Sequence, residues 1–227
     1  MRFVRILALD TSTELCSAAL WREGDIDSDE ALAGQRHAEL LLPTLDGLLG
    51  RYGLKVQDLD GIAYGHGPGS FTGLRIACGV VQGLAFGAGL PVVGVSTLLA
   101  LARAAPAARV VCCIDARMGQ VYHAAYERDG ERWVTLHAPA LCAPEAAPRL
   151  PDGPPWTGCG SGFKAYGAAL ERCYAGRLSA VFPDAYPHAR HIAELAVVEF
   201  AQGRTLAAEQ AMPVYIRDKV ALRSDER

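Results

Sequence analysis

A glycine-rich stretch, GHGPGSFTGLR, spans residues 65–75 and could hold a phosphate group. A glycine-rich turn that opens a helix presents free backbone N–H groups to an anion. However, no lysine follows Gly73 as in a Walker loop, and Thr72 stands where a dinucleotide fingerprint needs its third glycine. The other interpretation is a tight turn that needs a positive φ or a close backbone approach. These residues leave both interpretations open.

A second candidate for phosphate chemistry is Asp10, which precedes three hydroxyl residues at the end of an apolar run. In phosphotransfer folds, such a turn can place a carboxylate near a metal-bound phosphate. Asp, Ser and Thr also make the local hydrogen bonds of an ordinary turn. The candidate residues of a phosphate turn are Asp10, Thr11, Ser12, Gly67, Gly69 and Ser70.

The other reactive side chains form no recognised catalytic or zinc-binding motif. His188 and His191 lie three apart on a predicted helix, but there is no His-Glu-x-x-His pattern. A Gly-x-Ser-x-Gly nucleophile turn is also missing from the sequence. The seven cysteines have no Cys-x-x-Cys spacing, and most lie in apolar segments. We therefore expect buried, reduced thiols and no bound metal.

Alternating strand-like and helix-like segments must position these residues. Residues 5–33 are typical of a β-meander, and the leucine spacing in residues 37–53 predicts a helix. Strand, helix, strand and helix follow up to residue 105, and a similar order begins again after Pro106. This order predicts an α/β protein with two similar halves, residues 1–104 and 105–227, each a mixed sheet flanked by helices. The final segment is expected to pack back on the first half.

The predicted helix after the glycine turn contains four glycines, at positions 73, 79, 83 and 87. Each interior glycine costs about 1 kcal/mol relative to alanine. Small residues on one helix face let another backbone come close. Tight packing within the chain or the docking of a partner helix would offset the cost.

The preceding helix carries a leucine stripe that is wider than one core contact requires. Such a stripe is either buried on two sides or forms an exposed patch for a subunit. We predict that both helices contribute to a partner surface. Its predicted residues are Leu41, Leu45, Leu48, Gly73, Ala77, Val80, Gly83 and Gly87.

The bulk composition argues against a nucleic-acid or membrane protein. The net charge is −3 and no block of Lys or Arg occurs, so a large nucleic-acid footprint is not expected. The N-terminal apolar stretch is too short for a signal peptide. Residues 76–102 lack charge but are broken by Gly87, Gly89 and Pro91. We expect a cytoplasmic protein with no membrane span.

Four segments together resemble the TsaB, or YeaZ, family: ILALDTSTELCSAAL, RHAELLLPTLDGLL, GPGSFTGLRIACGVVQGLAFGAGLPVVGVSTLLALA and IDARMGQVYHAAY. The stretch PVYIRDKVA near the end also matches the family. The resemblance spans nearly the whole chain and is looser over residues 141–188. It implies the actin-like fold shared with sugar kinases and Hsp70. It also implies that the glycine turn descends from a phosphate turn and now launches the second helix.

The resemblance further implies a non-catalytic subunit that helps to make threonylcarbamoyladenosine in tRNA. The metal-binding histidines of the similar catalytic subunit, TsaD, would fall at Thr97 and Leu101, and Leu15 replaces an acid of that subunit. The implied partners are TsaD, the ATPase TsaE and a second copy of this chain. tRNA would be contacted only through the complex. No cofactor is expected in the isolated chain, although ATP or ADP could bind at a junction of the assembly.

A different class of function stays open from the residues. The chain could be a stand-alone actin-fold ATPase or phosphotransferase that uses Asp10 and the turn of residues 67–73.

Overall fold

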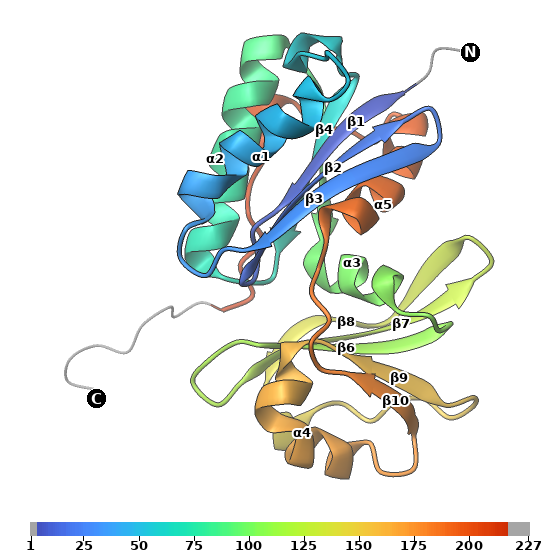
Figure 1. Cartoon of the computed structure of the whole chain (residues 1–227). Helices are drawn as coiled ribbons and strands as arrows, with labels where there is room; N and C mark the ends of the chain where they lie inside the picture. Colours follow the sequence, from blue (N-terminus) through green and yellow to red (C-terminus); the bar gives the residue numbers. More distant parts are fainter. Residues whose placement is uncertain (1–3, 218–227) are drawn as a thin grey trace.

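A five-stranded mixed sheet forms the centre of the first half of the molecule (Figure 1). The computed structural model describes residues 4–217. The sheet order is β3-β2-β1-β4-β5, in which β1 pairs antiparallel with β2 and parallel with β4. The strands are β1 (Arg5–Asp10), β2 (Leu15–Arg22), β3 (Asp25–Leu32), β4 (Gly61–Gly67) and β5 (Val92–Ser96).

Helices cover both faces of this sheet, which explains why β1 reads as an unbroken apolar run. Successive side chains of a strand point to opposite faces. Leu7 and Leu9 of β1 pack in the core under α1 (His37–Gly50) and α2 (Phe71–Ala88). Ile6 and Ala8 pack in a second core under α5 (Ala189–Ala201).

The second half is built on another five-stranded mixed sheet, in the order β10-β9-β6-β7-β8. Its middle strands are covered on one face by α3 (Thr97–Ala104) and on the other by α4 (Ser161–Cys173). The strands are β6 (Arg109–Asp115), β7 (Val121–Asp129), β8 (Arg132–Cys142), β9 (Trp156–Cys159) and β10 (Leu178–Phe182). The short 3-10 helices are η1 (Val56–Asp58), η2 (Pro144–Ala146) and η3 (Ala208–Gln210).

The chain crosses between the halves more than once, with α3 lying between the two sheets (Figure 1). After β10 it returns, and α5 packs on the first sheet. Leu206 then forms an antiparallel bridge with Val92 of β5. The described part of the predicted second half, residues 105–217, therefore supplies elements to both halves, and its later part packs back on the first.

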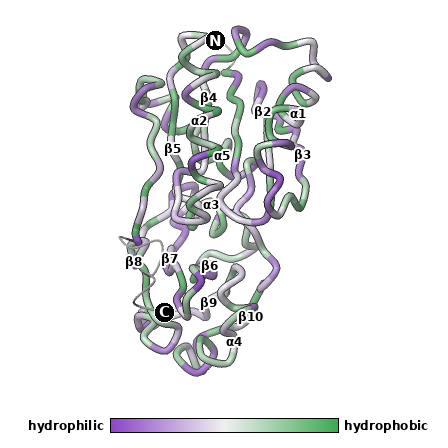
Figure 2. Tube along the Cα trace, turned by 90° about the vertical axis from the view of Figure 1, so that its left-hand side faces the viewer, coloured by the Kyte–Doolittle hydropathy of each residue, from purple (hydrophilic) through white to green (hydrophobic). Residues whose placement is uncertain are grey.

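Hydrophobic segments run through the strands and helices of both halves, and the connections are mainly hydrophilic (Figure 2). Helix α2 is long and apolar enough to cross a membrane by length and composition alone. One side of α2 is nonetheless buried in the first core through Ala77, Val81 and Ala85. All seven cysteines are free, and five of them are buried.

Candidate functional site

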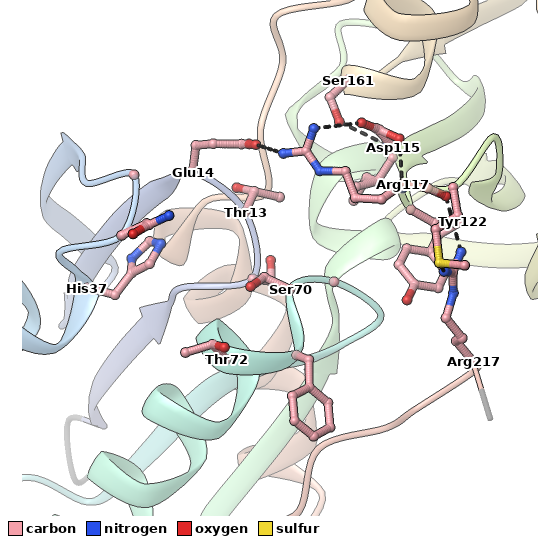
Figure 3. Close-up of a pocket in the computed structure, with 18 residues that line it drawn as sticks. Thr13, Glu14, His37, Ser70, Thr72, Asp115, Arg117, Tyr122, Ser161 and Arg217 are labelled. Atoms are coloured by element: carbon pink, nitrogen blue, oxygen red, sulfur yellow. Dashed lines mark hydrogen bonds and ion pairs between the residues drawn. The ribbon is translucent and has the colours of Figure 1, made fainter. Parts of the chain in front are cut away.

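A cavity of about 630 Å³ lies between the two halves, where the glycine turn faces the β6–β7 connection (Figure 3). The first half contributes the β1–β2 turn and the start of α2, and the second half contributes the ends of β6 and β7. Polar lining residues include Ser12, Ser70, Thr72, Asp115, Arg117 and Arg217.

An ion pair spans the cavity from one half to the other. Arg117 donates through Nη2 to Oε1 of Glu14 at 3.1 Å and through Nη1 to Oδ2 of Asp115 at 3.1 Å (Figure 3). The arginine side chain is 74% exposed. An ion pair with so much solvent exposure contributes little to stability. It shows that the two halves come close here, but it does not hold them together strongly.

The glycine turn is shaped by the chain's own backbone. Ser70 caps α2, because its Oγ accepts a hydrogen bond from the Gly73 amide at 3.3 Å. The Ser70 amide donates to the Ser12 carbonyl at 2.7 Å. A Cβ at Gly69 would overlap the Ser12 carbonyl, and one at Gly73 would overlap the Thr11 carbonyl. The tight-turn interpretation accounts for both glycines without a ligand.

The carboxyl group of Asp10 is buried behind the cavity and does not line it. Its Oδ1 accepts hydrogen bonds from the amide and hydroxyl of Ser12 at 3.0 and 2.8 Å. Its Oδ2 lies against Gly65 and has no hydrogen-bond partner among the described residues. Burial raises the pKa of Asp10 to about 7, outweighing the hydrogen bonds from Ser12, which lower it.

The structure therefore brings the predicted phosphate-turn residues together, but only some of them line the cavity. The β1–β2 turn lies directly against residues 67–73, and Thr11 Oγ1 donates to the Gly73 carbonyl at 2.7 Å. Three of the candidates line the cavity: Ser12, Gly69 and Ser70. The other three are buried: Asp10, Thr11 and Gly67.

Five residues predicted to contact a partner are instead part of the chain's own core. On α1 these are Leu41, Leu45 and Leu48, which are at most 2% exposed. On α2 they are Gly73 and Ala77. All five face inward because their side of each helix lies on the first sheet or the β1–β2 turn. The prediction that these five residues belong to the partner surface is corrected accordingly.

The opposite side of α2 is open. A Cβ at Gly79, Gly83 or Gly87 would meet no atom of residues 4–217 within 4 Å. Val80 is half-buried beside them. Two large apolar residues that the sequence analysis did not single out are exposed nearby in the helix pair: Phe86 of α2 at 77% and Leu42 of α1 at 51%. Their positions on the outer helical faces could have been derived once the inner faces were known.

Comparison with known proteins identifies the family. The model of the TsaD family, described as tRNA N6-adenosine threonylcarbamoyltransferase, matches residues 31–224. The tRNA threonylcarbamoyladenosine biosynthesis protein TsaB of Escherichia coli K12 is 40% identical over 225 residues, which cover 96% of each chain. The protein of the same name from Haemophilus influenzae is 38% identical over 97% of this chain and 96% of its own. The chain belongs to the TsaB family.

A solved structure of YeaZ from Pseudomonas aeruginosa has a TM-score of 0.88 to this chain and 41% identity, covering 93% of this chain and 99% of that one. The two mixed sheets flanked by helices are therefore the actin-like fold of this family. The resemblance in the sequence is confirmed. Residues 218–221 of the matching stretch PVYIRDKVA lie outside the described residues.

The two positions at which the resemblance would place metal-binding histidines have structural roles in this chain. Thr97 donates through Oγ1 to the Pro68 carbonyl at 2.5 Å, and Leu101 is fully buried between α3 and the sheet of the second half. Within residues 4–217, no group of three His, Cys, Asp or Glu side chains is arranged to hold a metal ion. His188 caps α5 through Nδ1 and contacts Glu30 through Nε2 at 2.6 Å.

Proposed function

We propose that this chain is a non-catalytic subunit of the machinery that makes threonylcarbamoyladenosine in tRNA. In this proposal it binds and stabilises the catalytic subunit TsaD in the cytoplasm and helps to recruit the ATPase TsaE. tRNA is reached only through the complex, and ATP or ADP binds at a junction between subunits. A second copy of the chain occupies the same surface when TsaD is absent.

The outer face of α2 carries the proposal. Gly79 and Gly83 each cost about 1 kcal/mol relative to alanine in a helix interior. A contact within the described part of the chain does not explain this cost, since a Cβ at either position would meet open space there. A partner helix seated on this face would explain it, because small residues, glycine above all, let two helix backbones approach closely.

Exposed apolar side chains beside the glycines support the same proposal. Phe86 and Leu42 are more than half exposed, and they lie on neighbouring helices that pack on the same face of the sheet. Aromatic side chains such as Phe86 contribute strongly to interface energies when they become buried, and Leu42 adds apolar area beside it. The partner surface is therefore proposed to consist of Gly79, Gly83, Gly87, Phe86 and Leu42, with Val80 at its base.

The alternative of a stand-alone ATPase is weakened by the position of Asp10. A metal-bound phosphate in the cavity would need an ionised carboxylate that faces it. Asp10 does not line the cavity, and its raised pKa leaves it substantially protonated at neutral pH. The glycines of the turn are also accounted for by contacts within the chain.

The variant Gly83→Leu tests the proposal. Light scattering of the purified chain mixed with TsaD from the same organism should give a one-to-one complex for the wild type and separate proteins for Gly83→Leu. Circular dichroism should show the variant folded, because the added side chain points into open space. Gly167→Leu, on α4 of the second half, is the matched control and should retain binding. Normal TsaD affinity of Gly83→Leu would refute the surface.

A further inference from the structure

Residues 211–217, here called the C-terminal strap, begin firmly attached to the first half. The carbonyl of Ala211 accepts hydrogen bonds from Cys78 Sγ at 2.9 Å and Gln82 Nε2 at 2.8 Å, both on α2. The hydroxyl of Tyr64 accepts from the Met212 amide at 2.9 Å and donates to the Met212 carbonyl at 3.1 Å. The backbone of the strap is thereby fixed on β4 and α2.

The middle of the strap lies against the glycine turn. The Val214 amide donates to the His66 carbonyl at 2.7 Å. A Cβ at Gly67 would be 2.6 Å from the Val214 carbonyl oxygen, and the φ of Gly67 is +119°. Only glycine combines that conformation with so close a backbone approach. Gly67, one of the phosphate-turn candidates, is thus needed to seat the strap.

Tyr215 attaches the strap to the first two turns of α2. Its ring lies 5.2 Å from the ring of Phe71, centroid to centroid. Its hydroxyl accepts a hydrogen bond from Arg75 Nε at 2.9 Å, and the Arg75 guanidinium stacks on Phe71 at 3.9 Å. Aromatic and cation–π contacts of this kind are directional and hold the three side chains in one arrangement.

Arg217 takes the strap across to the second half. Its Nη2 donates to the carbonyl of Arg117 at 3.2 Å and to Oε1 of Gln120 at 2.8 Å. Its Nη1 lies 2.9 Å from Sδ of Met118. All three acceptors belong to the β6–β7 connection, at the edge of the cavity. Arg217 therefore connects the strap, whose backbone is attached to the first half, to the second half through its guanidinium (Figure 3).

The connection that Arg217 holds is conformationally strained. Arg117 and Met118 have φ values of 61° and 55°, which are unfavourable for residues other than glycine. Such a conformation persists only where surrounding contacts favour it. Arg217 binds an atom of each residue, so its hydrogen bonds stabilise the connection in the form that reaches toward the first half.

We propose that the C-terminal strap is a latch that holds the two halves at a fixed spacing across the cavity, with Arg217 as the residue that closes it. The Glu14–Arg117 ion pair also spans the cavity, but its exposure makes it a weak restraint. The strap is anchored by backbone hydrogen bonds on one side and by a charged donor with several acceptors on the other. Hydrogen bonds that involve a charged group are stronger than neutral ones.

Hydrogen–deuterium exchange of the full chain tests the latch without any partner. Arg217→Met keeps the length of the side chain and removes its donors. We expect exchange to become about tenfold faster at residues 116–120 and also at the Ser12 and Ser70 amides on the far wall, which Arg217 does not contact. Gln120→Ala removes an acceptor and should act in the same direction. Exchange in the double variant should be only slightly faster than in the more affected single variant, because both substitutions remove the same Arg217–Gln120 hydrogen bond.

Arg204→Met is the matched control, since Arg204 lies in the same returning segment but pairs with Glu199 within the first half. It should leave exchange at the cavity walls unchanged. Unaltered exchange at Ser12 and Ser70 in Arg217→Met would overturn the latch. A uniform rise that includes β9 would also overturn it, because the strap would then contribute only general stability.

Discussion

Replacing Asp10 with asparagine should make folding much less dependent on pH. The carboxyl group of Asp10 is completely buried, and its Oδ2 finds no partner among the described residues. The folded chain therefore favours the protonated, neutral form. Asparagine has nearly the same shape and is neutral at every pH, so the variant removes the titration while preserving the Oδ1 acceptor that Ser12 uses.

The sign and size of the effect follow from the pKa values. The pKa is 3.8 for the reference carboxyl group, which represents the unfolded chain, and about 7 in the folded chain. Below 3.8 both states are protonated and this contribution to stability is fully present. It is lost as pH rises through the folded pKa, and it amounts to about 4 kcal/mol at 1.36 kcal/mol per unit. About 3 kcal/mol of that loss falls between about pH 5 and pH 8.

Urea denaturation of the wild type and Asp10→Asn at a series of pH values measures this effect. The free energy of unfolding of the wild type should fall relative to the variant by about 3 kcal/mol from about pH 5 to pH 8. Taking the difference between the two proteins cancels the titration of all other groups. Asp46→Asn, at an exposed position of α1, is the matched loss of a carboxylate. Parallel pH curves for wild type and Asp10→Asn would refute the reasoning, and the ATPase alternative would regain an ionised carboxylate.

Two further predictions concern open glycines and an unpaired histidine. Gly79→Ala and Gly83→Ala should each stabilise the isolated chain by about 1 kcal/mol, seen calorimetrically as a rise in Tm of about 2–4 °C, yet weaken association with TsaD. A lower Tm of the isolated chain would contradict the open space beyond these positions. His123 is fully buried, neither of its ring nitrogens has a partner among the described residues, and burial lowers its pKa to about 4. Because the folded chain disfavours the protonated ring, the free energy of unfolding is unaffected by this titration above the unfolded pKa of 6.5. It decreases as pH falls from 6.5 toward 4. His123→Phe should raise the free energy of unfolding by about 1–3 kcal/mol at neutral pH, because it removes two unpaired buried nitrogens. Urea denaturation should also show that the free energy of unfolding falls less steeply with acid in the variant. A lower free energy of unfolding of the variant at neutral pH would contradict the absence of partners for the ring nitrogens.

The order of elements was predictable because local patterns specify it. The apolar run of β1, the leucine spacing of α1 and the Ser70 cap before α2 are each contained within a short stretch of sequence. The free energy cost of glycines in α2 was likewise visible without coordinates. The family resemblance carried the fold further, since its motifs lie mostly in the strands and helices of the first half and also reach β6 and β7 of the second.

The orientation of those elements was not predictable in the same way. A wide leucine stripe showed that α1 has apolar residues on more than one side, but not that Leu41, Leu45 and Leu48 face the sheet while Leu42 faces outward. Helical periodicity specifies which residues share a face, whereas burial depends on what the rest of the chain places against that face.

The sequence by itself therefore determined the element order, the family and the presence of costly glycines, all of which depend on local pattern. Only the tertiary structure decided which glycines lie against another backbone segment and which face open space. It alone showed that Asp10 is buried away from the cavity, and that Arg217 hydrogen-bonds to a connection about one hundred residues earlier in the chain. Contacts between residues so far apart depend on how whole sheets and helices pack, and no local spacing records them.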